Sequence, residues 1–319
     1  MAIYVNTNIS SLNGRRHLNN VQNQLNTTYQ RLSSGMRINS AKDDAAGLQI
    51  ADRLTTQING LNQGNRNTND GIALAQTIES GMDEMSGMLQ KIRTLAVQAA
   101  NGTNTKEDRE SIDKEGAALQ AEVTRIAQQT KFGGKTVLNG YRKDSSIYQD
   151  NVPAAQGGGV QAAQAGSTGL ITLQIGANKG DEIVARVEDF AFTAIVARAN
   201  KAAGGAAGND PFKDAFEGGN LKLETRSGAA AVITLMDAMI SQVDSQRSDL
   251  GAIQNRLESS IRNQSNVAAN QSDARSRIRD ADFAEESAAL SQQSIIQQAA
   301  TSMLMQANSR PQLALSMLG

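Results

Sequence analysis

The sequence predicts a mainly α-helical protein in which long N- and C-terminal segments form an antiparallel, coiled-coil-like bundle, with a small β-hairpin region and a reduced outer domain. Residues 1–140 and 231–319 carry helical patterns rich in Gln, Asn, Ser and Ala. Residues 141–230 break into Gly/Ala-rich loops and short strand-like runs. Aromatic residues are only 3 % of the chain, which suits thin bundles in which each helix buries one stripe. This layout lets the chain fold back so that its termini meet.

Apolar residues in the N-terminal part recur at intervals of three and four. The second of three such series is unbroken over more than three heptads, and the third follows a break at Asn101-Gly102. Sustained spacing of this kind is typical of coiled-coil-like packing. The series are Leu18, Val21, Leu25, Thr28 and Leu32; Ala75, Ile78, Met82, Met85, Leu89, Ile92, Ala96 and Ala99; and Ile112, Gly116, Leu119, Val123 and Ile126.

The C-terminal part repeats this spacing with polar interruptions. Small Ala and flexible Met at the repeating positions suit close, adjustable contacts between helices. The members are Ile240, Val243, Arg247, Leu250, Gln254, Leu257 and Ile261 and, near the end, Ile296, Ala299 and Met303.

Start and stop signals agree with these helices. Ser40–Asp43 and Thr105–Asp108 have the spacing of capping boxes, with Asp in place of the usual Glu. The prolines Pro153, Pro211 and Pro311 are expected outside the long helices.

The middle of the chain changes period. Leu170–Ile175 and Glu182–Val187 predict two strands of a hairpin, joined by a loop at Gly176–Gly180. Residues 151–169 and 199–220 are Gly/Ala-rich and are expected to form loops or a small, poorly ordered outer domain, of which little must pack.

Composition excludes several classes of function. The net charge of −1 gives no general case for nucleic acid. Residues 1–42 carry five basic side chains and no acid, whereas residues 281–310 carry three acids and one Arg. This difference favours pairing of the two arms, although solvated faces of two unrelated helices would explain the charges equally well. The chain has no Cys, which rules out disulfides and thiolate metal sites. We expect neither a cleaved leader nor membrane insertion, because no apolar run is long enough.

No catalytic constellation is evident. His17 is the only histidine and lies in a basic helical segment. Gly133–Thr136 resembles the end of a phosphate loop, but Gln129 stands where the earlier Gly is required. Lys42-Asp43-Asp44 suits helix capping better than acid–base work. We therefore expect no enzyme activity, no cofactor and no metal.

Two long segments carry a specific resemblance. Thr28–Ile58 reads TYQRLSSGMRINSAKDDAAGLQIADRLTTQI, and Asn263–Asn308 reads NQSNVAANQSDARSRIRDADFAEESAALSQQSIIQQAATSMLMQAN. These segments closely resemble the N- and C-terminal regions of bacterial flagellins. Leu95–Thr105 (LAVQAANGTNT) and Ile171–Ile183 (ITLQIGANKGDEI) are also flagellin-like. The resemblance covers about residues 1–140, 170–187 and 231–319.

The resemblance implies three regions. Residues 1–43 with 282–319 would form an inner coiled-coil polymerisation domain. Residues 44–190 with 228–281 would form a rod domain that includes the hairpin, with 141–169 as a variable loop. Residues 191–227 would be a reduced variable outer region.

The resemblance also implies a structural function outside the cell. Members of the family are exported unfolded by a type III pathway without a cleaved signal peptide, and polymerise into the helical filament used for swimming. Their termini fold on assembly. The implied partners are further copies of the chain, an export chaperone, the filament cap protein and the hook-associated junction proteins. A hook–filament junction protein is the alternative.

Candidate residues follow from the patterns and the resemblance together. The expected polymerisation seams are Leu18, Val21, Leu25, Leu32, Leu290, Ile296, Ala299 and Met303. The expected core of the rod domain is Ile78, Met82, Met85, Leu89, Ile92, Ile112, Leu119, Val123, Ile126, Leu250, Leu257 and Ile261.

Two further sites are candidates. The resemblance places contacts to a vertebrate Toll-like receptor on Lys91, Leu95 and Glu115, although Leu95 can also serve packing and the other two can be solvated. Lys91 stands where strongly detected members have Arg, and Lys lacks the planar fork of Arg, so weaker detection is expected. Candidate O-glycosylation sites are Ser145, Ser146, Ser167 and Thr168, although a plain soluble loop is the favoured interpretation of this segment.

Overall fold

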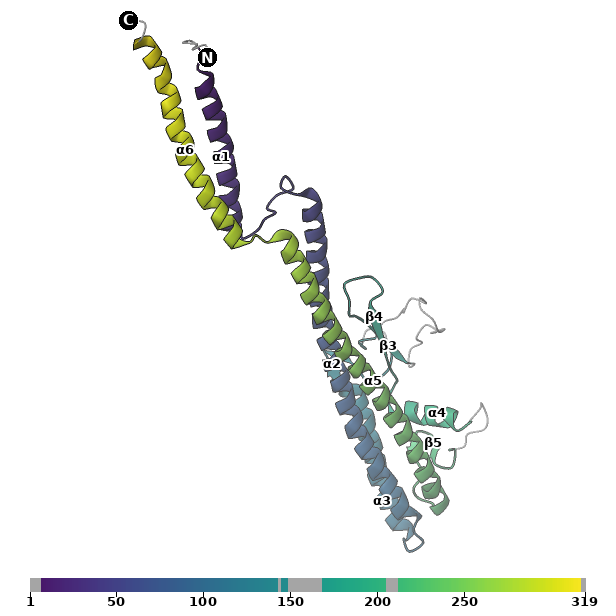
Figure 1. The fold of residues 1–319 in the computed structure, drawn as a ribbon. Coiled ribbons are helices and arrows are strands. Elements are labelled where there is room, and N and C mark those ends of the chain that lie inside the picture. Colours follow the sequence, from purple (N-terminus) through teal and green to yellow (C-terminus); the bar gives the residue numbers. More distant parts are fainter. Residues whose placement is uncertain (1–6, 143–144, 149–167, 205–211, 317–319) are drawn as a thin grey trace. The chain divides into compact units, whose positions relative to one another are not determined.

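The computed structural model describes residues 7–142, 145–148, 168–204 and 212–316, and at 217 and 310–316 it describes the backbone alone. Over these ranges it has six helices and three two-stranded antiparallel sheets, as the mainly helical prediction requires (Figure 1). The chain forms two compact units, Met1–Asn59 with Val267–Gly319 and Gly60–Asn266. We call them unit 1 and unit 2. No helix of the described chain is long and apolar enough to span a membrane.

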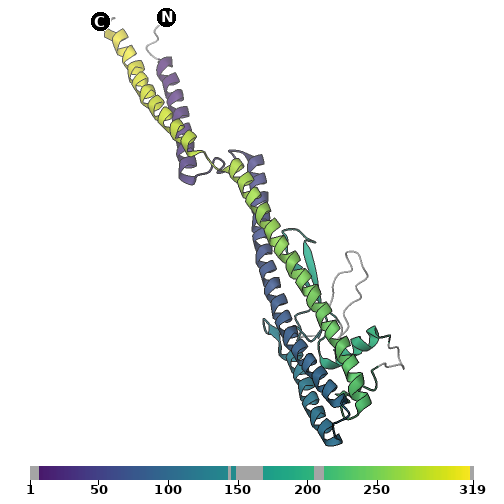
Figure 2. The same cartoon turned by 60° about the horizontal axis from the view of Figure 1, so that its bottom comes forward.

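Unit 1 is built on two antiparallel helices, α1 (Ile9–Ser34) and α6 (Phe283–Ser316), which lie side by side in both views (Figures 1 and 2). Two polar contacts set their register. Asn8 caps α1 and also donates from Nδ2 to the carbonyl oxygen of Ala307 at 2.7 Å. Nearer the other end, Arg31 pairs with Glu286 at 3.1 Å.

The two chain segments that leave this helix pair are joined to each other. α1 ends at Gly35, whose φ of 68° is the left-handed conformation that glycine favours. The backbone N–H of Arg37 donates to Arg279 O at 2.7 Å, and that of Ala281 donates to Gly35 O at 3.0 Å. The segments therefore form a short antiparallel bridge between α1 and α6 on one side and the next helices on the other.

Next along the chain are α2 (Ala45–Ala100) and, returning, α5 (Arg226–Arg279). The start of α2 corrects one prediction. Asp43 accepts hydrogen bonds from the backbone of Asn39 and Ser40 and so closes a turn before the helix. The cap of α2 is Asp44, which accepts from Gly47 N at 2.9 Å.

In unit 2, α2 and α5 run antiparallel. Arg93 pairs with Asp237 at 2.6 Å, and Arg247 pairs with Asp83 at 3.1 Å. α3 (Lys106–Gln129) begins with the predicted capping box, in which Thr105 and Asp108 exchange side-chain and backbone hydrogen bonds. That prediction is confirmed.

The apolar core of unit 2 is continuous and gathers side chains from α2, α3, α5 and the middle of the chain. The expected core residues of the rod domain all lie in unit 2. Nine are buried and three are half-buried; the buried ones are Ile78, Met82, Met85, Leu89, Ile92, Ile112, Val123, Leu250 and Leu257, and the others are Leu119, Ile126 and Ile261.

The predicted hairpin is present as β3 (Gly169–Gln174) and β4 (Glu182–Val187). Its turn lies directly on the backbone of α2. A Cβ on Gly60 would fall 2.7 Å from the Ala177 side chain, and one on Gly64 would collide with the carbonyl oxygen of Ile175. Only glycine fits beneath this turn.

Two further hairpins are minimal: β1 (Lys131–Phe132) with β2 (Lys135–Thr136), and β5 (Phe216–Glu217) with β6 (Asn220–Leu221). The β1–β2 turn uses Gly133 and Gly134 at φ 57° and 83°. The phosphate-loop-like sequence is thus a tight turn.

The middle of the chain packs more than the sequence analysis expected. α4 (Phe192–Ala202) buries Phe192 and Ile195 completely in the core of unit 2. Arg198 lies over the ring of Phe190 and pairs with Glu188, and burial lowers the pKa of its guanidinium. Pro311 lies inside α6, which corrects its expected place; Pro153 and Pro211 fall outside the described residues.

Candidate assembly surface

The α1–α6 pair separates the predicted seam residues into two groups. Leu18, Val21 and Leu32 are half-buried and Leu25 is buried, all along the packed pair. Leu290 of α6 is half-buried as well. These residues hold the two helices of one chain together.

The other predicted seam residues point away from the pair. Ala299 is exposed, and Ile296 and Met303 keep 42 % and 70 % of their surface accessible. The three lie at spacings of three and four, hence on one face of α6. The structure does not bring this face together with the α1 leucines.

Sequence reasoning missed further apolar side chains exposed on unit 1. They are Ile9, Leu12 and Tyr29 on α1, Ile50 on α2, and Phe283, Ile295 and Met305 on α6. A signal for those of α6 was available, because its apolar residues occur on nearly every face. A helix that is apolar all round is ordinarily buried.

The helix pair itself buries little. Leu25 and Thr28 are the buried residues of α1, and none of the α6 side chains that the structure describes is buried. Unit 1 thus combines a thin internal contact with a wide apolar exterior. Such a surface marks a site of association between proteins.

The charges on α1 and α6 favour the alignment of the two helices that the Asn8–Ala307 and Arg31–Glu286 contacts set. Arg31 and Glu286 realise the predicted pairing of a basic and an acidic arm, and only 12 % of the Glu286 side chain is accessible. Near the bridge, hydrogen bonds from the backbone of Ser40 and then Asn39 lower the pKa of Asp43.

The part of unit 1 that the structure describes has no catalytic arrangement beside this surface. His17 is exposed on α1. Among the described residues, no three His, Cys, Asp or Glu side chains gather in a metal-binding group. Burial raises the pKa of Tyr148, whose hydroxyl donates to Val137 O and so serves packing.

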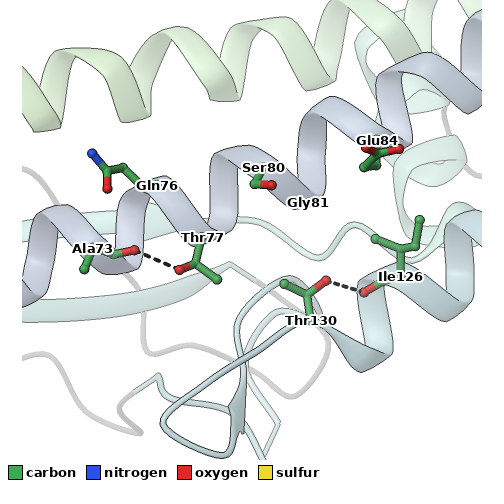
Figure 3. Close-up of a pocket in the computed structure, with 8 residues that line it drawn as sticks. All are labelled: Ala73, Gln76, Thr77, Ser80, Gly81, Glu84, Ile126 and Thr130. Carbon is green, nitrogen blue, oxygen red and sulfur yellow. Dashed lines mark hydrogen bonds between the residues drawn. The ribbon is translucent and has the colours of Figure 1, made fainter.

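Unit 2 has a shallow groove between α2 and α3 (Figure 3). The Thr77 and Thr130 hydroxyls that line it each donate to the backbone oxygen four residues earlier, that of Ala73 and Ile126 respectively (Figure 3). Glu84 is its sole titratable residue. No hydrogen bond joins Glu84 to a hydroxyl among the residues that line the groove (Figure 3).

The candidate receptor contacts differ among themselves. Lys91 and Glu115 are exposed and form an ion pair at 3.3 Å between α2 and α3. Leu95 is only 8 % accessible and belongs to the core of unit 2.

The candidate glycosylation sites also differ. Ser145 is exposed, and Thr168 is half-buried. Ser146 is buried, and its hydroxyl accepts from Arg142 N and donates to Arg142 O, both at 2.9 Å. Ser167 lies outside the described residues.

Comparison with known proteins covers the whole chain. Residues 5–143 match the bacterial flagellin N-terminal helical region, and residues 233–318 match the bacterial flagellin C-terminal helical region. Flagellin D of Vibrio anguillarum is 40 % identical and polar flagellin C of Vibrio parahaemolyticus is 36 % identical, each with 100 % of both chains covered. The crystal structure of Bacillus cereus flagellin is 25 % identical over 62 % of this chain and 88 % of that one, with a TM-score of 0.44.

Proposed function

Because the chain belongs to the bacterial flagellin family and is a structural subunit of the flagellar filament, we propose that subunits join through the exposed apolar side chains of α1 and α6. The observation that carries this proposal is the outward face of α6, formed by Ile296, Ala299 and Met303. Neighbouring copies would cover it. Because a filament is open, the contact is heterologous: the outward face meets a different surface of the next copy. No observation favours the junction-protein alternative.

We also propose that the termini order only on assembly. Fixing the backbone costs about 1–2 kcal/mol per residue, and the α1–α6 pair buries too few side chains to offset that cost alone. Contacts with neighbouring subunits supply the missing burial, so folding of the termini and association become one event.

Seeded growth tests both proposals. Purified subunit would be added to short filament seeds, and light scattering would be followed together with far-ultraviolet circular dichroism. We expect growth with a rise in helicity. A subunit that stays soluble at constant helicity would contradict the proposals.

Ile296→Asp tests the surface itself. The new carboxylate would have to be buried in the contact, so polymerisation is expected to stop while unit 2 stays folded. Asn255→Asp, which adds the same charge at an exposed site of unit 2, is the control and is expected to polymerise. Normal Ile296→Asp filaments in electron microscopy would refute the assignment. Leu25→Asp is also expected to block growth, by separating α1 from α6.

The regional boundaries at 43/44 and 281/282 are part of the proposal. They fall at the non-helical breaks between α1 and α2 and between α5 and α6. Limited proteolysis of the free subunit is expected to leave a fragment that begins near residue 44 and ends near residue 281. A fragment retaining either terminus would contradict the inner domain.

On the ground of family membership, we propose that the chain is exported without a cleaved leader. We also propose that it contacts an export chaperone, the cap protein and junction proteins. Mass spectrometry of the N-terminal peptide from shed filaments tests the first point. A peptide that starts at residue 1 or 2 is expected, and a later start would show processing. We propose no catalytic role.

Recognition by a Toll-like receptor is proposed for the exposed Lys91–Glu115 pair. Leu95 would contribute by holding the α2 surface in place. Lys91→Arg adds a planar fork and is expected to increase the signal of a receptor reporter assay. Equal signals from both proteins would remove Lys91 from the contact.

O-linked sugars, if present among the described candidates, are best accommodated at Ser145, because the Ser146 hydroxyl is engaged in the chain. The intact mass of filament protein before and after Ser145→Ala tests this: loss of a sugar mass supports the site, and an unchanged mass excludes it.

A further inference from the structure

The methionines of this chain fall into sharply different environments. The chain has ten, and four of them, Met82, Met85, Met236 and Met239, are completely buried in unit 2. Met303 and Met305 of α6 are the most exposed methionines that the structure describes. A Met thioether is readily oxidised when an oxidant can reach it.

The two exposed thioethers flank one contact. Leu304 faces α1, where its Cδ1 would lie 3.1 Å from a Cβ placed on Gly14. Successive residues of an α-helix are about 100° apart, so Met303 and Met305 project to either side of that contact. Among the residues that the structure describes, none covers either of them.

We propose that Met303 and Met305 are an oxidation site, and that hydroperoxides convert them to sulfoxides on the free subunit and thereby block its addition to the filament. A lone pair of the thioether sulfur attacks the outer oxygen of the hydroperoxide. The O–O bond breaks, the attacked oxygen stays on sulfur, and its proton passes to the departing oxygen, which leaves as water when the oxidant is hydrogen peroxide. The sulfur is oxidised and the peroxide is reduced. This inference rests on the assembly surface proposed above.

The consequence follows from polarity. A sulfoxide is polar, and Met oxidation disrupts apolar interfaces. Burying a polar group without a partner is unfavourable enough to weaken each contact about tenfold. Once a subunit is assembled, its neighbours shield both sulfurs. Free subunits are therefore expected to be sensitive and filaments resistant.

The experiment treats purified subunit with hydrogen peroxide, maps sulfoxides by peptide mass spectrometry, and measures elongation from seeds. We expect sulfoxide at Met303 and Met305, little at the four buried methionines, and at least about a tenfold rise in critical concentration. Filaments treated in the same way are expected to remain unmodified at both positions. Unmodified Met303 and Met305 in the free subunit would overturn the proposal.

The double variant Met303→Leu/Met305→Leu assigns the effect. The measured quantity is the ratio of elongation rates with and without peroxide for each protein, so any difference between the untreated proteins cancels. The variant should keep a ratio near one, and methionine sulfoxide reductases should restore growth of oxidised wild type. Equal peroxide sensitivity in the variant, or normal growth of sulfoxide-bearing wild type, refutes the site. Failure of untreated wild type to grow would count against the assembly surface itself.

Discussion

The α1–α6 pair and the core of unit 2 are both helical, yet they use their apolar side chains in opposite ways. Unit 2 turns its large apolar residues inward around Met82, Leu89 and Leu235, which are completely buried. The α1–α6 pair leaves side chains such as Ile295 and Met305 in solvent. Because burial of apolar surface is the main favourable term in folding, we expect unit 2 to be stable in a free subunit, whereas the proposed assembly would supply the burial that the pair lacks.

The largest expected effect is the difference in unfolding free energy between a variant in the core of unit 2 and a variant of the α1–α6 pair. Leu89→Ala empties a completely buried site of unit 2 and should lower the free energy of unfolding by about 2–5 kcal/mol. Ile296→Ala, on an exposed face, should change it by less than about 0.5 kcal/mol. Urea unfolding of free subunits measures both. Similar losses of unfolding free energy for the two variants would contradict this difference between the core of unit 2 and the α1–α6 pair.

Gly64→Ala tests how closely unit 2 is packed. The added methyl meets the backbone of Ile175, which cannot move aside like a flexible side chain, so a cost of about 1–3 kcal/mol is expected. Gly87→Ala, in the same helix with open space around it, is the control and should not destabilise. The comparison would use thermal unfolding of the two free subunits.

Removing Arg31 should act only after assembly. Arg31→Ala leaves the largely covered Glu286 carboxylate without its partner and should weaken filaments by about 1 kcal/mol per subunit. The melting temperature of the free subunit should not change. Arg277→Ala breaks an exposed pair within α5 and should have less effect on filament dissociation. A lower melting temperature of free Arg31→Ala subunits would show that the pair is ordered before assembly.

The smallest expected effect is on the stability of the protein at acidic pH. The backbone hydrogen bond from Thr105 lowers the pKa of Asp108 below its usual 3.8. A lowered pKa in the folded state stabilises unit 2 above about pH 4, and this contribution is lost as the pH falls through the folded value. Asp43 has a lowered pKa for a similar reason in unit 1. Asp108→Asn should make the unfolding free energy of free subunits less dependent on pH in acid. Asp43→Asn should change the pH dependence of filament stability only.

The sequence predicted what local periodicity and turn chemistry determine. Spacing located the helices containing Ile78 and Leu250, and the Thr105–Asp108 box marked the start of α3. It could not say which face of α6 meets α1, because that helix is apolar on several faces and only register contacts such as Asn8–Ala307 choose between them.

The missed helix has a different cause. Phe192, Ile195, Val196 and Ala199 of α4 do follow helical spacing, but they lie between a predicted strand and a Gly/Ala-rich segment typical of loops. Their burial depends on a distant partner, the core built by α2 and α5, which a local pattern does not contain. The cap at Asp44 in place of Asp43 similarly depends on how the preceding turn closes.

The hydrogen-bonded bridge between residues 35–38 and 279–281 has a mechanical consequence. A force applied to the α1–α6 pair reaches the rest of the subunit through two chain segments. The backbone hydrogen bonds at Arg37 and Ala281 join those segments to each other. The two chain segments then share the applied force, and neither can extend without breaking the hydrogen bonds of the bridge. A filament that transmits torque would gain from this, because the two chain segments at this non-helical break act together.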